Sequence, residues 1–238
     1  MTIAAILFDK DGTLFHFGAT WEAWASAFLN RVTGGDSGQA ARLGNAIGFD
    51  VVTGRFHPDS IVIAGTPAEV AEALAVHLPH MSRHEVIAML NQEAETAPQA
   101  EAVPLRPYLD GLRARGMRLG VATNDGETPA LAHLNTAGVA GCFDFVAGFD
   151  SGFGAKPDPG QLIAFARAVG VPAEQVAMVG DSTHDLIAGR SAGMTTVGVL
   201  TGMADANELG PYADVVLPDI GHLPVWLGHE PTRNESDA

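Results

Sequence analysis

The chain has 238 residues, of which 47% are hydrophobic and 17% are charged, and its formal net charge is −15. This composition excludes a disordered chain, and the length suffices for one large or two modest domains. The negative charge argues against nucleic acids and anionic membranes as partners. No apolar run is long enough to span a membrane, and the N-terminus shows no secretion signal. We therefore expect a cytoplasmic protein, with its single cysteine, Cys142, buried among apolar neighbours.

An acidic cluster follows the first apolar run, residues 3–8, which has the composition of a buried parallel strand. The cluster reads Asp9-Lys10-Asp11-Gly12-Thr13. Asp9 and Asp11 are two residues apart, so a continuing strand would point both carboxylates the same way. Gly12 allows a sharp turn and the close approach of a ligand. The alternative is an ordinary polar turn, whereas an EF-hand loop is excluded because Leu14 stands where that loop needs glycine.

Residues 16–97 show helical patterns and no alternating strand pattern. Apolar residues from Trp21 to Leu29 recur at helical spacing, and we interpret Trp21 and Trp24 as core residues rather than as a cofactor stack. A loop is predicted over residues 33–40, a helix over 41–51 and an irregular connection over 53–65. Capping boxes that begin at Thr66 and Ser82 predict two further helices. The whole stretch is thus expected to be helical.

From about residue 98 the pattern changes to strands that alternate with helices. Such alternation predicts an α/β fold with a doubly wound parallel sheet. The first strand belongs to this sheet, but its successor arrives only near residue 118, so the helical stretch is an inserted domain. We predict a core of residues 1–15 and 98–228, a helical cap of residues 16–97 and a flexible tail of residues 229–238. The predicted strands after the first are residues 118–123, 143–147, 176–179, 195–200 and 215–217.

Three more polar groups follow strands or precede helices in this core. They are Thr123 with Asn124, Lys156 in a glycine-rich loop, and Asp181 with Asp185. Each has an ordinary structural explanation as a turn, a solvated lysine or a helix N-cap. Together, however, they would converge on one crevice at the carboxyl ends of the strands. Four carboxylates there require a cation, and oxygen ligands favour Mg²⁺, while the threonine, the lysine and turn amides suit a phosphoryl group.

These four motifs, in this order, resemble those of the haloacid dehalogenase superfamily. The resemblance is to its phosphatases with a helical cap inserted after the first motif, such as the phosphoglycolate phosphatases. It covers about residues 1–200 and implies a Rossmann-like core. Lys10 occupies a position that varies among relatives, so no catalytic task is assigned to it. Because Asp11 is present, dehalogenation itself is not expected.

The resemblance also implies a role for each matched residue. Asp9 would attack phosphorus as the nucleophile, and Asp11 would act as general acid and base. Mg²⁺ would be held by Asp9, the Asp11 backbone carbonyl and Asp181. Asp185 would bind the ion through a water molecule or would contact the residues that bind it. The phosphoryl oxygens would be bound by Thr123 and Lys156, and the predicted substrate-binding set is Gly12, Thr13, Thr123, Asn124 and Lys156.

The predicted function is a Mg²⁺-dependent phosphatase that hydrolyses a small-molecule phosphate monoester, phosphoglycolate-like, through an aspartyl-phosphate. One alternative is a phosphomutase of the same superfamily that acts on a sugar phosphate, and a remote one is a non-catalytic binding or regulatory protein. A monomer or a homodimer is expected. Specificity is expected to lie in the cap, with His16, Arg55 and His57 as candidates. Arg55 could pair with a substrate carboxylate, although a solvated loop arginine is the ordinary alternative.

Overall fold

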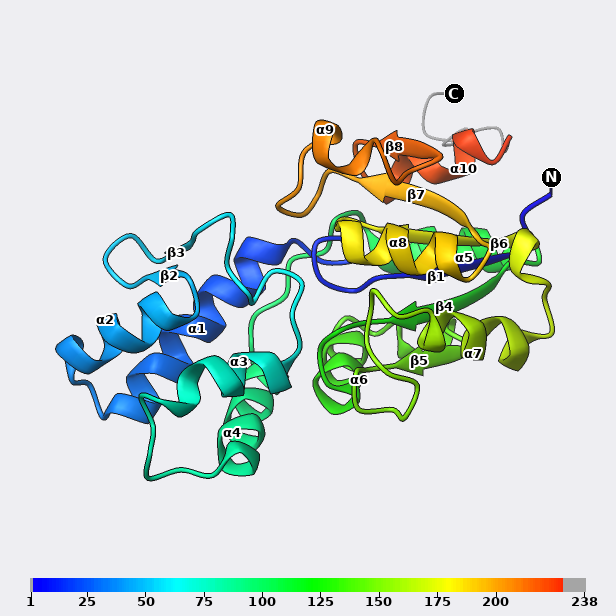
Figure 1. Cartoon of the computed structure of the whole chain (residues 1–238). Coiled ribbons are helices and arrows are strands. Elements are labelled where there is room, and N and C mark those ends of the chain that lie inside the picture. Colours follow the sequence, from blue (N-terminus) through cyan, green and yellow to red (C-terminus); the bar gives the residue numbers. More distant parts are fainter. Residues whose placement is uncertain (1, 229–238) are drawn as a thin grey trace.

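A computed structural model describes residues 2–228 (Figure 1), so the predicted flexible tail lies outside the described residues. The chain forms an α/β core and a smaller cap. The cap is inserted between strand β1 (Ala5–Phe8) and the core helix α5 (Leu105–Ala114), which precedes strand β4 (Arg118–Ala122). Within residues 2–228, no helix has both the length and the apolar character needed to cross a membrane.

The core contains a six-stranded sheet in the order β5-β4-β1-β6-β7-β8. All of its strand pairs are parallel. The sheet places β1 between β4 and β6, so the strand order reverses beside β1 and opens a crevice at the carboxyl ends of the strands. This arrangement confirms the predicted doubly wound fold. The remaining strands are β5 (Phe145–Ala147), β6 (Val176–Gly180), β7 (Thr195–Val199) and β8 (Val215–Leu217).

Helices cover both faces of the sheet, which explains why its central strands are apolar throughout. Ile6 and Phe8 pack toward α5 (Leu105–Ala114), α6 (Glu127–Thr136) and α10 (Leu223–Trp226). Ala5 and Leu7 face the other side, where α7 (Gly160–Val169) and α8 (Thr183–Ser191) pack. A short helix, α9 (Ala206–Leu209), follows β7, and three 3₁₀ turns complete the core: η1 (Ala140–Cys142), η2 (Ala173–Gln175) and η3 (Ile220–His222). Cys142 is buried, as predicted.

The cap consists of four helices around a separate apolar core. They are α1 (Phe17–Thr33), α2 (Ser37–Ala46), α3 (Pro67–Ala75) and α4 (Arg83–Glu95). Trp21 and Trp24 belong to this core, which confirms the interpretation of the tryptophan pair. Both predicted capping boxes are present, at the first turns of α3 and α4.

The cap departs from the sequence-based expectation in two places. A two-stranded antiparallel ribbon, β2 (Phe49–Asp50) with β3 (Arg55–Phe56), lies in a stretch expected to be helical and irregular. Its turn forms because Asp50 accepts hydrogen bonds from the next residues and Gly54 adopts a positive φ of 70°. The predicted loop over residues 33–40 is also too long. Helix α2 begins at Ser37 because Asp36 caps it by accepting a hydrogen bond from the Gln39 amide.

Candidate active site

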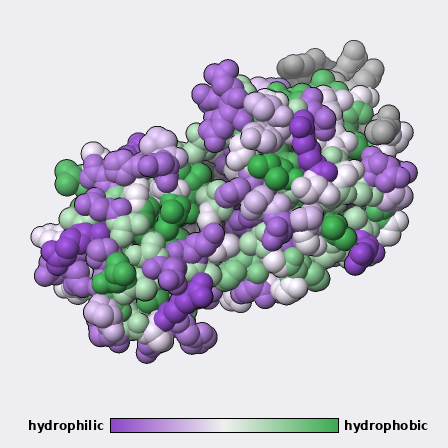
Figure 2. Space-filling view, viewed as in Figure 1, coloured by the Kyte–Doolittle hydropathy of each residue, from purple (hydrophilic) through white to green (hydrophobic). Residues whose placement is uncertain are grey.

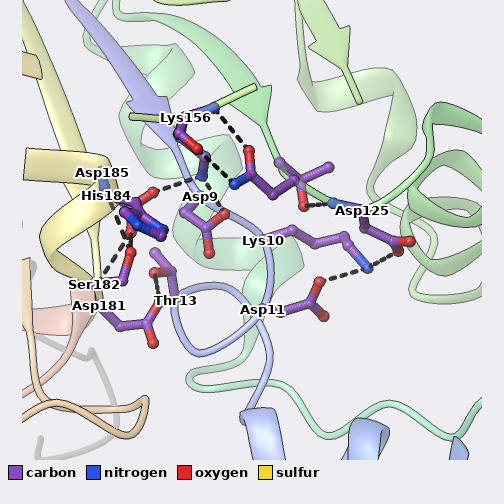
Figure 3. A network of polar contacts seen from close by, with 12 residues as sticks. Asp9, Lys10, Asp11, Thr13, Asp125, Lys156, Asp181, Ser182, His184 and Asp185 are labelled. Atoms are coloured by element: carbon purple, nitrogen blue, oxygen red, sulfur yellow. Dashed lines mark hydrogen bonds and ion pairs between the residues drawn. The ribbon is translucent and has the colours of Figure 1, made fainter. Parts of the chain in front are cut away.

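Three polar side chains of the site follow strands that are neighbours in the sheet. Asp9 follows β1, Thr123 follows β4, and Asp181 follows β6. The strands end at the same level because Phe8 of β1 is in register with Val179 of β6. Parallel strands present their carboxyl ends at one edge of the sheet, so Asp9, Thr123 and Asp181 line one pocket there. Figure 3 shows Asp9 and Asp181 at this edge.

A cluster of three buried carboxylates forms the centre of the site. One oxygen from each of Asp9, Asp181 and Asp185 lies within 4.8 Å of the others. Asp185 is in the first turn of α8, where its Oδ2 accepts hydrogen bonds from Ser182 N (3.0 Å) and Ser182 Oγ (2.7 Å). This capping box leaves Asp185 Oδ1 to face the site, so the helix start itself orients the third carboxylate.

Lys156 brings a buried positive charge into this cluster. Its Nζ lies 2.6 Å from Asp9 Oδ1 and 2.5 Å from Asp185 Oδ1. Asn124 fixes the backbone of the lysine, because its Oδ1 accepts from Lys156 N and its Nδ2 donates to Lys156 O, both at 2.8 Å. The same Nδ2 also donates to Ala64 O of the cap at 2.8 Å. Asn124 thus ties the lysine loop to the end of β4 and to the cap.

The carboxylate cluster fits a divalent cation. Burial, with Asp185 and Asp11 close by, raises the pKa of Asp9 to about 7, although Lys156 opposes this shift. Burial, with Asp9 and Asp185 close by, holds the pKa of Asp181 well above its usual value. One lysine cannot balance three buried carboxylates, and a set of oxygen donors is what Mg²⁺ prefers. The predicted metal residues Asp9, Asp181 and Asp185 are therefore brought together, whereas the Asp11 carboxylate is not part of the cluster.

Two glycines allow the chain to pass close to Asp181. Gly12 has a φ of 82°, and a Cβ there would lie 2.2 Å from Asp181 Oδ2. A Cβ at Gly202, after β7, would lie 1.6 Å from the same oxygen. Thr13 Oγ1 donates to Asp181 Oδ1 (3.3 Å), and Thr201 Oγ1 donates to Gly12 O (2.5 Å). The sequence singled out Gly12 and Thr13, but not the loop after β7 that encloses Asp181 from the other side.

A second buried network surrounds Lys10, whose side chain is fully buried. Its Nζ lies 2.9 Å from both Asp11 Oδ2 and Asp125 Oδ2, and 2.7 Å from His133 Nδ1. His133 Nε2 in turn lies 2.6 Å from Ala94 O of cap helix α4. The network holds one oxygen of Asp11, while Asp11 Oδ1 is buried without a hydrogen-bond partner among the described residues. Figure 3 shows Lys10 turned away from Asp9 and toward Asp11 and Asp125.

Comparison with known proteins identifies the family. The sequence model described as haloacid dehalogenase-like hydrolase matches residues 3–193. The chain belongs to this family. Among curated relatives, a phosphoglycolate phosphatase of Rhodospirillum rubrum is 33% identical over 232 residues, covering 94% of this chain and 90% of the relative. The pyrophosphatase PpaX of Bacillus velezensis is 29% identical over 210 residues, covering 88% and 89%.

Solved structures share the fold of this chain. The crystal structure of a predicted phosphoglycolate phosphatase from Haemophilus somnus has a TM-score of 0.71 at 19% identity, covering 95% of this chain and 98% of that one. At this identity the likeness shows the fold alone. The family match and the curated relatives confirm the predicted family and the predicted enzyme class, a phosphatase.

The cap of this phosphatase covers the site with mostly apolar side chains. The pocket that contains Asp9 and Lys156 is lined on the cap side by α1, by the 62–67 segment, and by one side each of α3 and α4. In the space-filling view, the outer surface of both lobes mixes polar and apolar residues, and a hollow separates the lobes where the cap meets the core (Figure 2). The apolar wall belongs to the interior of the pocket, because its aromatic residues Phe17, Trp21 and Trp24 are buried.

The cap residues suggested by the sequence do not line this pocket. His16 and His57 are exposed. Arg55 has a side chain that is 73% exposed and pairs with Glu22 at 3.4 Å. Arg55 is therefore solvated, as the ordinary alternative held, although it lies in the short strand β3 rather than in a loop. The geometry does not support a pairing of Arg55 with a substrate carboxylate in this pocket.

The Lys10 network was missed at the sequence level. A signal was present, because Lys10 and Lys156 are the only two lysines of the chain. His133 gave none, since a single histidine on a helix has no spacing that points to a partner. The contact of the network with Ala94 O places it between the loop after β1 and the cap. We interpret Lys10 as a positioning residue for Asp11.

The burial of His133 predicts how the stability of the fold depends on pH. Burial, together with nearby Lys10, lowers the pKa of His133 from 6.5 to about 4. The folded protein thus holds it neutral, whereas the unfolded chain protonates it near pH 6.5. Its contribution to the free energy of unfolding is full above pH 6.5 and declines as the pH falls toward 4, by roughly 3 kcal/mol in total.

The measurement is urea unfolding of the wild type and of His133→Gln between pH 4 and pH 8. Glutamine keeps an acceptor and a donor for Lys10 and Ala94 O but does not titrate. We expect the difference between the two proteins to shift in favour of the variant as the pH falls. A difference that stays constant over this range would show that His133 is not held neutral.

Proposed function

We propose that this chain is a Mg²⁺-dependent phosphatase that hydrolyses a small-molecule phosphate monoester through an aspartyl-phosphate on Asp9. The observation that supports it is the buried Asp9 carboxylate at the end of β1, in contact with Lys156 and beside Asp181 and Asp185. Asp11, two residues further on, supplies a second carboxyl group in the same pocket. A nucleophile, an acid–base group and a cation are the elements that phosphoryl transfer needs.

The reaction proceeds in two displacements. In the first, a carboxylate oxygen of Asp9 forms a bond to phosphorus, the ester P–O bond breaks, and Asp11 gives its proton to the departing oxygen. In the second, Asp11 takes a proton from water as the water oxygen bonds to phosphorus, and the bond between phosphorus and Asp9 breaks. Inorganic phosphate leaves, and both carboxyl groups return to their starting states. Acid–base assistance of this kind contributes typically about 10²–10⁴-fold to the rate.

The remaining site residues bind and orient the phosphoryl group. Lys156 reduces the repulsion between Asp9 and the anionic phosphate. Thr123 Oγ1 accepts a hydrogen bond from the Asp125 amide at 3.1 Å, so its own proton is available for a phosphoryl oxygen. Gly12 and Thr13 would present the loop after β1 to the same group, and Asn124 holds Lys156 in place. A bound Mg²⁺, held by Asp9, the Asp11 carbonyl, Asp181 and Asp185, would neutralise charge on the phosphoryl oxygens.

The first test is metal removal. We expect the protein to release phosphate from a set of phosphate monoesters in the presence of Mg²⁺. This activity should be lost in EDTA and should return when Mg²⁺ is restored in excess. Mg²⁺ is also expected to stabilise the fold, by about 2.7 kcal/mol at a concentration 100 times its dissociation constant. Undiminished hydrolysis in EDTA, or no release from any ester with Mg²⁺, would contradict the proposal.

The same assay separates the alternatives. A phosphomutase incubated with a hexose 1-phosphate would form an isomer and little free phosphate, whereas a phosphatase releases phosphate. A non-catalytic binding protein would do neither. The expected cytoplasmic location and the expected monomer or homodimer stay predictions, to be checked by fractionation and by size-exclusion chromatography with light scattering.

A further inference from the structure

The cap wall of the pocket carries no charge. Among the described residues, every cap residue that lines the pocket is apolar or neutral. Its aromatic part is rigid: Phe17 stacks on Trp21, with ring centroids 6.4 Å apart, and Trp21 meets Trp24 edge-on at 5.1 Å. Trp24 is fixed further because its Nε1 donates to Leu90 O at 3.0 Å. The organic part of a substrate would therefore face a preformed apolar surface.

Two of the three basic groups near the pocket are already engaged by carboxylates. Lys156 is engaged by Asp9 and Asp185. Lys10 is fully buried behind the pocket wall and held by Asp11 and Asp125. The other basic residue in the pocket lining is His184 of the core, whose Nδ1 lies 3.3 Å from Ala64 O.

A substrate carboxylate would be unfavourable in these surroundings. It would lie between the apolar cap wall and the acidic core residues, five of which line the pocket: Asp9, Asp11, Asp125, Asp181 and Asp185. An anion buried without a partner pays a large desolvation penalty, which the neighbouring carboxylates would increase. A second phosphate group would meet the same obstacle.

A sugar would also find few partners on the cap side. The Thr66 hydroxyl is already used, because it donates to Glu69 Oε2 (2.9 Å) and accepts from Glu69 N (3.3 Å) in its capping box. Among the cap residues of the lining, two buried polar atoms lack partners within the described part of the chain, Trp21 Nε1 and Asn91 Oδ1. One donor and one acceptor match an organic group with one or two polar atoms and not a polyol.

We propose that the substrate is a phosphate monoester whose organic part is uncharged and mainly apolar, aromatic or aliphatic. This inference rests on the proposed phosphatase function and narrows its substrate class, and it departs from the phosphoglycolate-like substrate that the resemblance implied. It sets this chain apart from its relatives named as phosphoglycolate phosphatase and pyrophosphatase, whose named substrates are anionic beyond the reacting phosphate.

The test compares esters of primary alcohols, so that the chemistry of the leaving group stays similar. Benzyl phosphate, ethyl phosphate and phosphoglycolate are assayed with Mg²⁺, together with pyrophosphate and glucose 6-phosphate. We expect kcat/KM to fall in the order benzyl, ethyl, phosphoglycolate, with at least about a tenfold difference between the first and the last. Phosphoglycolate, pyrophosphate or glucose 6-phosphate equal to or better than benzyl phosphate would overturn the inference and leave the proposed phosphatase intact.

A gain-of-function variant tests the wall directly. Val62 lines the pocket and is 8% exposed, so Val62→Arg would bring a cation to the wall. We expect kcat/KM for phosphoglycolate to rise about tenfold relative to ethyl phosphate. The matched control is Val76→Arg, at an 80% exposed cap position outside the pocket lining. This variant should leave kcat/KM unchanged for both substrates. Because a misfolded variant cannot gain activity, a rise identifies the wall as the determinant, and its absence in a folded variant counts against it.

Binding provides a readout that does not depend on turnover. The fluorescence of Trp21 and Trp24 in the inactive Asp9→Asn protein should change on titration with benzyl phosphate at lower concentration than with phosphoglycolate. The reverse order would overturn the inference. If all esters bind but none is hydrolysed by the wild type, the proposed function fails while the binding preference stands.

Discussion

Replacement of Asp9 by asparagine is expected to abolish phosphate release, lowering kcat by about 10⁴-fold or more, as removal of a nucleophile does in other covalent mechanisms. Asparagine has nearly the same shape but lacks the charged oxygen that bonds to phosphorus. The measurement is steady-state phosphate release with Mg²⁺ for both proteins. Acid quench of the wild type during turnover should also trap a phosphate-labelled protein, and the variant should carry no label.

The fold serves as the control for this variant. Asp9 is one of three clustered buried carboxylates, and its raised pKa shows that its charge is unfavourable there without a cation. We therefore expect Asp9→Asn to be no less stable than the wild type in EDTA, so that lost activity cannot be ascribed to unfolding. Substantial phosphate release by a folded Asp9→Asn protein would refute the aspartyl-phosphate mechanism.

Replacement of Lys156 by methionine is expected to impair both activity and stability. The variant keeps the length of the side chain but removes the buried cation that contacts Asp9 and Asp185. Loss of one charged donor to the transition state lowers kcat by about 10²–10³-fold. The carboxylates left without it destabilise the metal-free fold by about 3–5 kcal/mol. Burial lowers the pKa of Lys156, but the nearby carboxylates of Asp185 and Asp9 raise it by more, so that the net shift is upward. This raised pKa is consistent with the coupling between the lysine and its two partners.

A double variant separates the two effects. Lys156→Met with Asp185→Asn removes the cation together with one of its carboxylate partners. We expect it to recover part of the lost stability in urea unfolding but none of the lost activity. Recovery of activity along with stability would show that Lys156 supports the fold and does not act on the phosphoryl group.

The contacts of Lys10 could not be predicted from the sequence. The motif that contains it identified Asp9 and Asp11 through their spacing after an apolar strand, but spacing gave Lys10 no partner. Its partners Asp125 and His133 are 115 and 123 residues away in the sequence. Only the packing of α6 beside the end of β1 and against cap helix α4 brings them together. Contacts over such separations depend on tertiary packing, which a local pattern does not encode.

The tryptophan pair illustrates a second limit. Helical spacing correctly placed Trp21 and Trp24 in the cap core, yet both also line the pocket. Amphipathic periodicity tells which face of a helix is buried, but not whether the burying partner is another helix or a bound molecule. For the same reason, charged residues such as Arg55 were suggested for specificity, while the wall that faces the site is apolar.

The sequence by itself determined the order and type of the core elements, the family, and the residues at the strand ends. It could do so because buried parallel strands, capping boxes and closely spaced carboxylates are local features, and because parallel strands always end at one edge of their sheet. The tertiary structure decided what these residues contact: the Lys156 bridge between Asp9 and Asp185, the glycines around Asp181, the Lys10 network and the uncharged cap wall. These depend on how the cap and the loops pack over the sheet, and that packing is set by many distant side chains at once.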